Sequence, residues 1–153
     1  MISEGEPAPD FELTSDSGET VKLSQFRGRP VVLYFYPRDD TPGCTAEACE
    51  FRDAYDVFRE RGIEILGVSP DTEASHLKFK SKYGLPFTLL ADPEHEAAEA
   101  YGVWVEKTTY GKKHMGIERS TFLIDADGNV ASAMRGIRPA GHAAEVLAAL
   151  SSR

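Results

Sequence analysis

The chain has 153 residues, and its 17 Lys and Arg against 25 Asp and Glu give a formal net charge of −8 at pH 7. Hydrophobic residues make up 41% of it, enough for one core without disulfide staples, so we expect a single domain over residues 1–153. The acidic balance disfavours nucleic acid as a partner, because phosphates would be repelled. The first seven residues lack a secretory signal, and no apolar run approaches the roughly 18 residues of a membrane span. We therefore expect a cytoplasmic protein with no membrane partner.

The first half of the chain predicts a hairpin and then a parallel strand–helix–strand unit. Asp10–Leu13 and Thr20–Leu23 flank a Ser-Asp-Ser-Gly turn signal, which indicates a small N-terminal β-hairpin. Continuous apolar runs at Pro30–Tyr36 and Ile63–Ser69 indicate strands buried on both faces. Between them, Thr45–Arg61 lacks Gly and Pro and has apolar residues at helical spacing, which predicts an amphipathic helix. The two strands should therefore be parallel.

The second half predicts helices and strands in alternation, ending with an antiparallel pair and a helix. The expected helices are Asp71–Tyr83, Pro93–Tyr101 and Pro139–Leu150, and the expected strands are Phe87–Ala91, Ser120–Asp125 and Val130–Arg135. The Gly-containing stretch with Lys107, Lys112, Lys113 and His114 predicts a solvated loop. This order resembles the thioredoxin fold, an α/β sandwich whose mixed central sheet is flanked by helices, here with an N-terminal β-hairpin extension.

Cys44 and Cys49 are the only cysteines, and Cys44 has the surroundings of a reactive thiol. It follows a Thr-Pro-Gly turn, at the point where the loop after the first buried strand becomes a helix. Free N–H groups and the positive end of the helix dipole favour an anion at such a position. The pattern therefore indicates a nucleophilic thiolate rather than a small buried hydrophobic residue.

Cys49 lies five positions after Cys44, on the same predicted helix. Ideal helix geometry places the two Cα atoms about 8.7 Å apart, with side chains about 140° apart, whereas a disulfide joins Cα atoms at most about 7 Å apart. A Cys44–Cys49 disulfide therefore requires the first helical turns to unwind. Cys49 shares its side of the helix with Asp53, Asp56 and Glu60, which predicts a thiol near solvent. It is either a resolving thiol or an incidental surface cysteine.

The residues around Cys44 resemble the active-site motif of the peroxiredoxins, which are thiol peroxidases on a thioredoxin fold. The motif is carried by Pro37, Thr41 and Cys44 at fixed spacing. The longer run Thr41–Asp53 is similar to the bacterioferritin comigratory protein (peroxiredoxin Q) subfamily, and matching stretches extend to Arg119–Asp125. The resemblance covers nearly the whole chain.

The resemblance implies that Cys44 is the peroxidatic cysteine, that Cys49 is the resolving one, and that the two form a redox disulfide. Four further site residues follow from it: Thr41 and Arg119 as catalytic, and Pro37 and Gly43 as substrate-binding. The implied reaction reduces hydrogen peroxide and organic hydroperoxides through a Cys44 sulfenic acid. Thioredoxin or a similar dithiol would then recycle the enzyme, with no cofactor and no metal. We expect a monomer.

General chemistry is consistent with these roles. Arg119 is a permanent cation that can stabilise a thiolate and a departing oxygen, and the Thr41 hydroxyl can both donate and accept. Without the resemblance, Arg119 would be interpreted as a solvated charge at a strand edge. The four histidines are scattered, with none at metal-ligand spacing from the cysteines, which disfavours a zinc site.

Two other classes of function stay open at this point. A thioredoxin-like disulfide reductase would require a C-x-x-C motif, whereas the two cysteines here have four residues between them. A redox-switched binding protein would use an unwinding helix to expose a surface for a partner. Peroxide consumption by the reduced protein separates the peroxidase from both.

Overall fold

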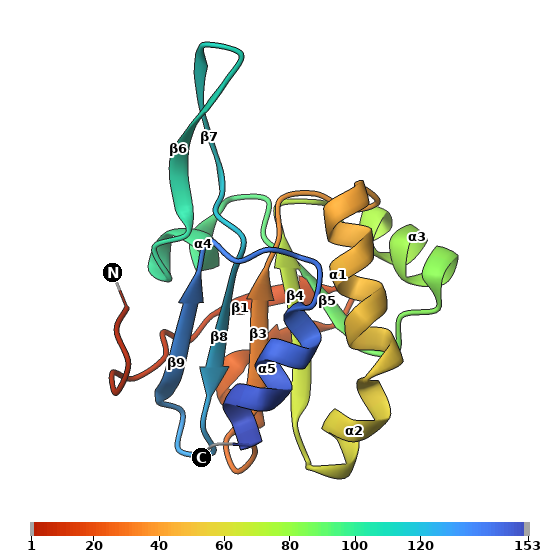
Figure 1. The fold of residues 1–153 in the computed structure, drawn as a ribbon, viewed down its shortest axis with the longest axis vertical. Coiled ribbons are helices and arrows are strands. Elements are labelled where there is room, and N and C mark those ends of the chain that lie inside the picture. Colours follow the sequence, from red (N-terminus) through yellow and green to blue (C-terminus); the bar gives the residue numbers. More distant parts are fainter. Residues whose placement is uncertain (1, 152–153) are drawn as a thin grey trace.

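The computed structural model describes residues 2–151 and contains fifteen elements of secondary structure (Figure 1). The strands are β1 (Glu12–Ser15), β2 (Thr20–Lys22), β3 (Val31–Phe35), β4 (Glu64–Ser69), β5 (Thr88–Ala91), β6 (Trp104–Thr109), β7 (Lys112–Ile117), β8 (Ser120–Ile124) and β9 (Val130–Arg135). The helices are the 3-10 helix η1 (Leu23–Phe26), α1 (Pro42–Asp53), α2 (Tyr55–Glu60), α3 (Glu73–Tyr83), α4 (Glu96–Ala100) and α5 (His142–Ser151).

A mixed sheet of seven strands, in the order β2-β1-β5-β4-β3-β8-β9, forms the centre of the molecule. Strands β3, β4 and β5 are parallel, so the predicted strand–helix–strand unit is confirmed. Strands β8 and β9 continue the sheet in antiparallel fashion beside β3. The N-terminal hairpin joins the other edge through β1 and β5, so it extends the main sheet. The expected thioredoxin-like architecture is confirmed.

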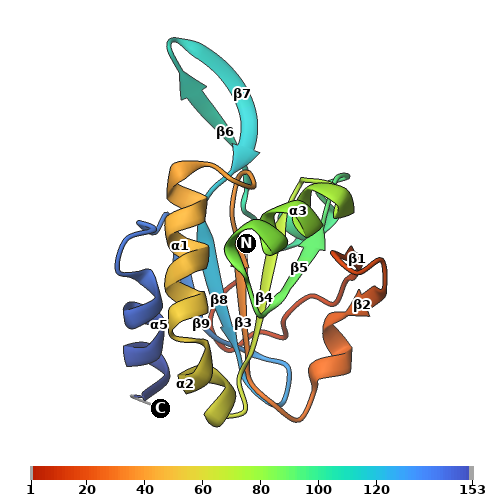
Figure 2. The ribbon, with the colours of Figure 1, turned by 90° about the vertical axis from the view of Figure 1, so that its right-hand side faces the viewer.

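Strand β3 is buried on both faces and sends alternate side chains into two apolar cores. Val32 and Tyr34 enter the core that also contains residues of α1, α3 and α5. Helices α1 and α5 lie side by side there, on one face of the sheet (Figure 2). Leu33 and Phe35 enter the opposite core, together with α4 and the N-terminal strands. The continuous apolar run is thus explained by burial on both sides.

The helix predicted over Thr45–Arg61 is two helices, α1 and α2, separated by a break at Ala54. Helix α1 begins earlier than predicted because Pro42 fits its first turn, where an N–H group has no intrahelical partner. Both cysteines lie on α1, as predicted. Cys44 is buried in the first turn and Cys49 is half-buried.

Three other helices begin later than the sequence indicated. Helix α3 begins at Glu73 rather than Asp71, because Thr72 is its N-cap residue. Helix α5 begins at His142 rather than Pro139, since Gly141 precedes it with a left-handed φ of 78°. Helix α4 spans Glu96–Ala100 rather than Pro93–Tyr101, because His95 in front of it also has a left-handed conformation.

The loop predicted for the basic stretch 107–114 is wrong. This stretch belongs to the hairpin β6–β7, which projects from the sheet (Figure 1). Its turn residues Tyr110 and Gly111 both have positive φ, as a two-residue hairpin turn of this type requires. Lys107, opposite His114 in the hairpin, is half-buried, whereas the other basic residues are exposed, as expected.

Gly67 of β4 has no side chain, and the Tyr34 ring occupies the space beside it, packed against α1. A Cβ at Gly67 would lie 2.9 Å from Cζ and the hydroxyl of Tyr34 and 2.9 Å from Cδ2 of Leu89. The Tyr34 ring is stacked on Tyr36 and Phe51 and has no room to retreat. We expect Gly67→Ala to lower the free energy of unfolding by about 1–3 kcal/mol, measured by denaturant titration.

Gly116→Ala is the control for this substitution. The nearest atoms to a Cβ at Gly116 would belong to the end of the Lys107 side chain, with Cδ at 3.2 Å, and that side chain can move. Its stability should stay within about 0.5 kcal/mol of wild type. An equal loss in both variants would show that the space beside Tyr34 is not the cause.

Candidate active site

Cys44 lies in the first turn of α1. This end of α1 lies beyond the carboxyl end of β3 (Figure 1). Thr41 is the N-cap residue and has an extended backbone, but its side chain does not cap the helix. The first helical hydrogen bond runs from the Thr45 N–H to the Thr41 carbonyl, at 2.8 Å. The N–H groups of Gly43 and Cys44 therefore have no acceptor within the helix. They are donors available to an anion or to a substrate oxygen beside the sulfur.

Arg119, directly before β8, binds two side chains of α1. Its Nη2 donates to Sγ of Cys44 at 3.3 Å, and its Nη1 donates to Oε1 of Glu47 at 2.7 Å. Cys44 and Glu47 lie one turn apart on the buried side of α1, so one guanidinium reaches both. The Arg119 carbonyl accepts a hydrogen bond from the Ile137 N–H at 3.0 Å, which holds the backbone at this position.

Burial makes the charges in this cluster costly. It raises the pKa of Glu47 to about 7, against the lowering effect of Arg119. Burial also opposes the charge of Arg119, but Glu47 and Cys44 outweigh it and raise the pKa of the guanidinium above its ordinary value. Oε2 of Glu47 has no hydrogen-bond partner among the described residues. Cys44 thus contacts a permanent cation, Arg119, whose other partner, Glu47, can gain or lose a proton.

This arrangement can support nucleophilic chemistry at sulfur. A thiolate would lie beside a fixed cation and at the positive end of a helix. The same guanidinium and the free N–H groups can stabilise negative charge that develops on a departing oxygen.

Gly43 and Thr41 have distinct surroundings. A Cβ on Gly43 would lie 3.2 Å from Nη2 of Arg119 and 3.4 Å from Cγ of Pro139, so a larger residue would press on the guanidinium. The Thr41 hydroxyl donates to the Arg38 carbonyl at 2.9 Å rather than to the sulfur. The oxygen of that hydroxyl stays available to accept a hydrogen bond from another group.

The other two predicted site residues come before and after the cluster residues Gly43–Glu47 in the chain. Pro37 is half-buried in the loop between β3 and α1. Cys49 is half-buried on α1, and both cysteines are free thiols in this state. The structure therefore brings Cys44, Gly43 and Arg119 together and leaves the two sulfurs unbonded.

Glu47 received no role from the sequence, although it lies within the motif. Its position one turn after the reactive cysteine, on the buried side of an amphipathic helix, was the available signal. A buried acid needs a cation, and Arg119 is that cation.

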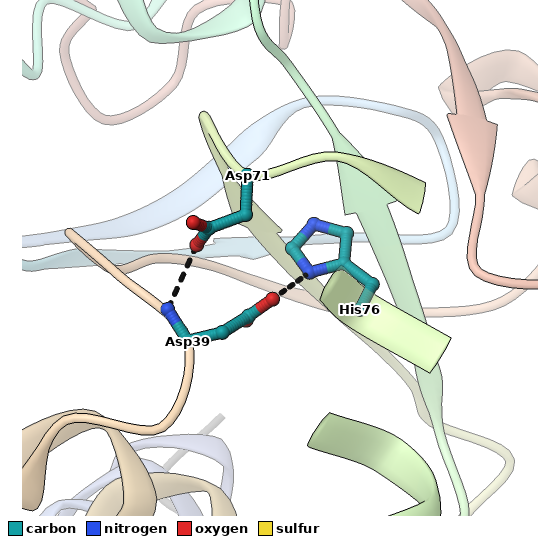
Figure 3. Close-up of side chains that lie close together, drawn as sticks. All are labelled: Asp39, Asp71 and His76. Carbon is teal, nitrogen blue, oxygen red and sulfur yellow. Dashed lines mark hydrogen bonds and ion pairs between the residues drawn. The ribbon is translucent and has the colours of Figure 1, made fainter. Parts of the chain in front are cut away.

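A second group that the sequence did not indicate is Asp39, Asp71 and His76, shown in Figure 3. Atoms of these three side chains all lie within 4.8 Å of one another, which is compatible with metal ligands. They are engaged in hydrogen bonds instead: Oδ2 of Asp39 lies 2.7 Å from Nδ1 of His76, and the Asp39 N–H donates to Oδ2 of Asp71 at 2.7 Å. The group is a hydrogen-bond network at the loop that leads to Cys44.

Comparisons with known proteins agree on one family. A family model described as AhpC/TSA family matches residues 5–133. The chain is similar to peroxiredoxin Bcp of Bacillus subtilis, at 54% identity over 149 residues that cover 97% of this chain and 95% of the relative. It is also similar to the bacterioferritin comigratory protein of Xanthomonas campestris, whose alkyl peroxide reduction activity has been studied structurally, at 40% identity, a TM-score of 0.92 and 98% coverage of both chains. A Xylella fastidiosa PrxQ mutant gives a TM-score of 0.94 at 35% identity, over 99% of this chain and 97% of that one.

The raised pKa of Glu47 predicts a pH dependence of stability. The folded value of about 7 lies above the ordinary 4.5, so the native protein holds this proton more tightly than the unfolded chain does. Its contribution to stability is then fully present below the ordinary pKa and is lost as the pH rises toward 7. Glu47→Gln removes this titration. We expect the stability of wild type relative to the variant to fall by on the order of 2 kcal/mol between about pH 5 and pH 8.

Denaturant unfolding at both pH values measures this difference. Glu60→Gln, the same substitution at an exposed position of α2, is the control, and its stability relative to wild type should stay constant. A constant difference for Glu47→Gln as well would contradict the assignment of the titration to this buried carboxyl.

Proposed function

The chain belongs to the AhpC/TSA family and is a peroxiredoxin, a thiol-dependent peroxidase, and from this premise we propose that Cys44 is its peroxidatic cysteine. The observation that carries the proposal is the 3.3 Å contact between Nη2 of Arg119 and the buried Sγ of Cys44, at the start of α1. We further propose that the substrates are hydrogen peroxide and organic hydroperoxides. The alkyl peroxide reduction activity of the similar Xanthomonas campestris protein supports the second class.

In the proposed reaction, the Cys44 thiolate attacks the terminal oxygen of the hydroperoxide. A sulfur–oxygen bond forms, the O–O bond breaks, and its electron pair leaves on the second oxygen, which takes up a proton to become water or an alcohol. Cys44 is thereby oxidised to a sulfenic acid. Arg119 and the free N–H of Cys44 stabilise the charge on the leaving oxygen. The Thr41 hydroxyl accepts from the hydroperoxide, while Pro37 and Gly43 shape the space around it.

The sulfenic acid is then resolved by Cys49. Its thiolate attacks the sulfur of Cys44, an S–S bond forms, the S–O bond breaks, and the sulfenic hydroxyl takes up a proton and leaves as water. Both cysteines lie on α1, where ideal geometry keeps their Cα atoms about 8.7 Å apart, so the first turns must unwind before the bond can form. An external dithiol restores both thiols by exchange and becomes a disulfide itself.

Membership of the family implies a peroxide substrate and a thiol reductant. We propose that the reductant is thioredoxin or a similar dithiol, and that the protein is a cytoplasmic monomer with one domain over residues 1–153. These finer assignments stay predictions. Within residues 2–151, no helix combines the length and the apolar character that a membrane crossing requires.

The two cysteines should have separable roles. We expect Cys44→Ser to abolish the reaction with hydrogen peroxide, because no other thiol lies beside Arg119. Cys49→Ser should react once and then accumulate as sulfenic or sulfinic acid. Stopped-flow oxidation of the reduced protein and intact mass measure both steps. A first reaction that survives Cys44→Ser but not Cys49→Ser would reverse the assignment. No peroxide loss in wild type would favour one of the two other classes, a disulfide reductase or a redox-switched binding protein.

Arg119 should act on the rate of peroxide attack. We expect Arg119→Ala to slow the formation of sulfenic acid by on the order of 10²–10³-fold, since a donor to the developing charge is lost. Arg119→Lys should recover part of the rate, because it keeps the charge but not the fork that spans Cys44 and Glu47. Thermal unfolding controls for the fold. An unchanged rate in the alanine variant would show that Arg119 has no part in the chemistry.

A further inference from the structure

The loop between β3 and α1 is fastened to the rest of the protein at Asp39 (Figure 3). Oδ1 of Asp39 accepts from the Tyr36 hydroxyl at 2.6 Å, and Oδ2 accepts from the Ser75 hydroxyl at 2.8 Å and lies 2.7 Å from Nδ1 of His76. The Asp39 N–H donates to Oδ2 of Asp71 at 2.7 Å. The loop is thus bound both to α3 and to the segment that follows β4.

The partners of Asp39 are themselves held in place. His76 is fully buried, and its Nε2 lies 2.9 Å from the Leu90 carbonyl of β5, so this nitrogen must carry a proton. Oδ2 of Asp71 also accepts from the Ser69 hydroxyl at 2.7 Å. Asp39 is only 9% exposed. Moving Asp39 out of this network would leave buried polar groups without hydrogen-bond partners, so breaking its contacts costs considerable free energy.

The next residue is held much less firmly. Asp40 is exposed, with a left-handed φ of 55°. Its carboxylate accepts from Lys82 at 2.8 Å and from the Tyr83 hydroxyl at 2.7 Å, and both contacts are exposed to solvent. Exposed ion pairs contribute little to stability. The firm attachment of the loop therefore ends at Asp39, just before α1 begins.

We propose that Asp39, held by His76, is a positioning residue that sets the balance between two forms of the reactive segment. In the intact form, the first turn of α1 presents Cys44 to Arg119. In the unwound form, the chain beyond Asp39 lets Cys49 reach the Cys44 sulfenic acid. The proposal rests on the proposed function of the two cysteines.

The two steps of the reaction require different forms of the segment. A change in Asp39 that alters the balance between the forms can therefore be distinguished from one that weakens the whole fold. Peroxide attack requires the intact form, whereas disulfide formation requires the unwound one. When the unwound form is the minor one, loosening the anchor raises its population and the rate of disulfide formation by the same factor, with little loss of peroxide reactivity. General damage to the fold would slow both steps.

Asp39→Asn tests this, because it keeps the shape and the backbone N–H but removes the carboxylate that accepts from the Tyr36 and Ser75 hydroxyls and lies beside Nδ1 of His76. In the full-length protein we expect the rate constant of disulfide formation after one equivalent of hydrogen peroxide to rise about tenfold, as for loss of one strong buried hydrogen bond. In excess hydrogen peroxide, where a second peroxide molecule oxidises the sulfenic acid, the fraction of Cys44 overoxidised to sulfinic acid should fall, since the sulfenic acid is consumed faster by Cys49. Intact-mass sampling after rapid mixing measures both.

Asp40→Asn is the matched control. The same change at this adjacent, exposed residue should leave the rate constant of disulfide formation and the overoxidised fraction within about twofold of wild type. Ser75→Ala removes only one bond to Asp39 and should move disulfide formation in the same direction by a smaller factor, which keeps the test available if Asp39→Asn does not fold. An unchanged or slower disulfide step in a folded variant, or an equal effect of Asp40→Asn, would overturn the proposal. Absence of a sulfenic acid in wild type would instead overturn the proposed function.

Discussion

One half-buried cation, Arg119, determines how α1 meets the sheet. A guanidinium can be buried at this depth only if its donors find acceptors, and two of them find Cys44 and Glu47 on successive turns of α1. The rest of the site follows from this contact. Residue 43 must be small because the guanidinium occupies the space beside it. The β9–α5 connection closes over the same place, bound to Arg119 through Ile137 and to α1 through the 2.9 Å bond from the Gly141 N–H to Oε2 of Glu50.

The position of both cysteines on one helix makes the two halves of the reaction compete. The intact turn that activates Cys44 also keeps Cys49 too far away for a disulfide. Efficient attack on peroxide and efficient resolution therefore cannot both be maximised by one conformation. Two sets of contacts meet at the start of α1: the Arg119 cluster and the Asp39 network. Together they determine the balance between the intact and the unwound form of its first turns.

Most of the framework could be predicted from the sequence, because its signals are local. The apolar runs of β3 and β4 and the helical spacing between them identified the central parallel unit. The Thr-Pro-Gly turn before Cys44 located the reactive thiol at a helix start. These features depend on neighbours within a few positions, which a single sequence displays.

The features that the sequence did not reveal depend on distant contacts or on uncommon turn residues. Asp39 and His76 are 37 positions apart, and neither has a local pattern that indicates the other. The hairpin β6–β7 turns through Tyr110, which takes a left-handed conformation usually left to Asn, Asp or Gly. The break at Ala54 has neither Gly nor Pro to announce it.

That break has a consequence for how far a change in α1 can spread. A continuous helix propagates order and disorder along its hydrogen-bond ladder, so its turns behave as one cooperative unit. At Ala54 the ladder is interrupted, and α2 beyond it is held independently by the fully buried ring of Phe58. Unwinding that starts at Pro42 should therefore end at Ala54, before it reaches β4. For a helix this short, coil formation and re-formation take about a microsecond. Before the disulfide forms, the first turns of α1 can thus unwind and re-form faster than any thiol exchange, while α2 and β4 beyond the break keep their arrangement.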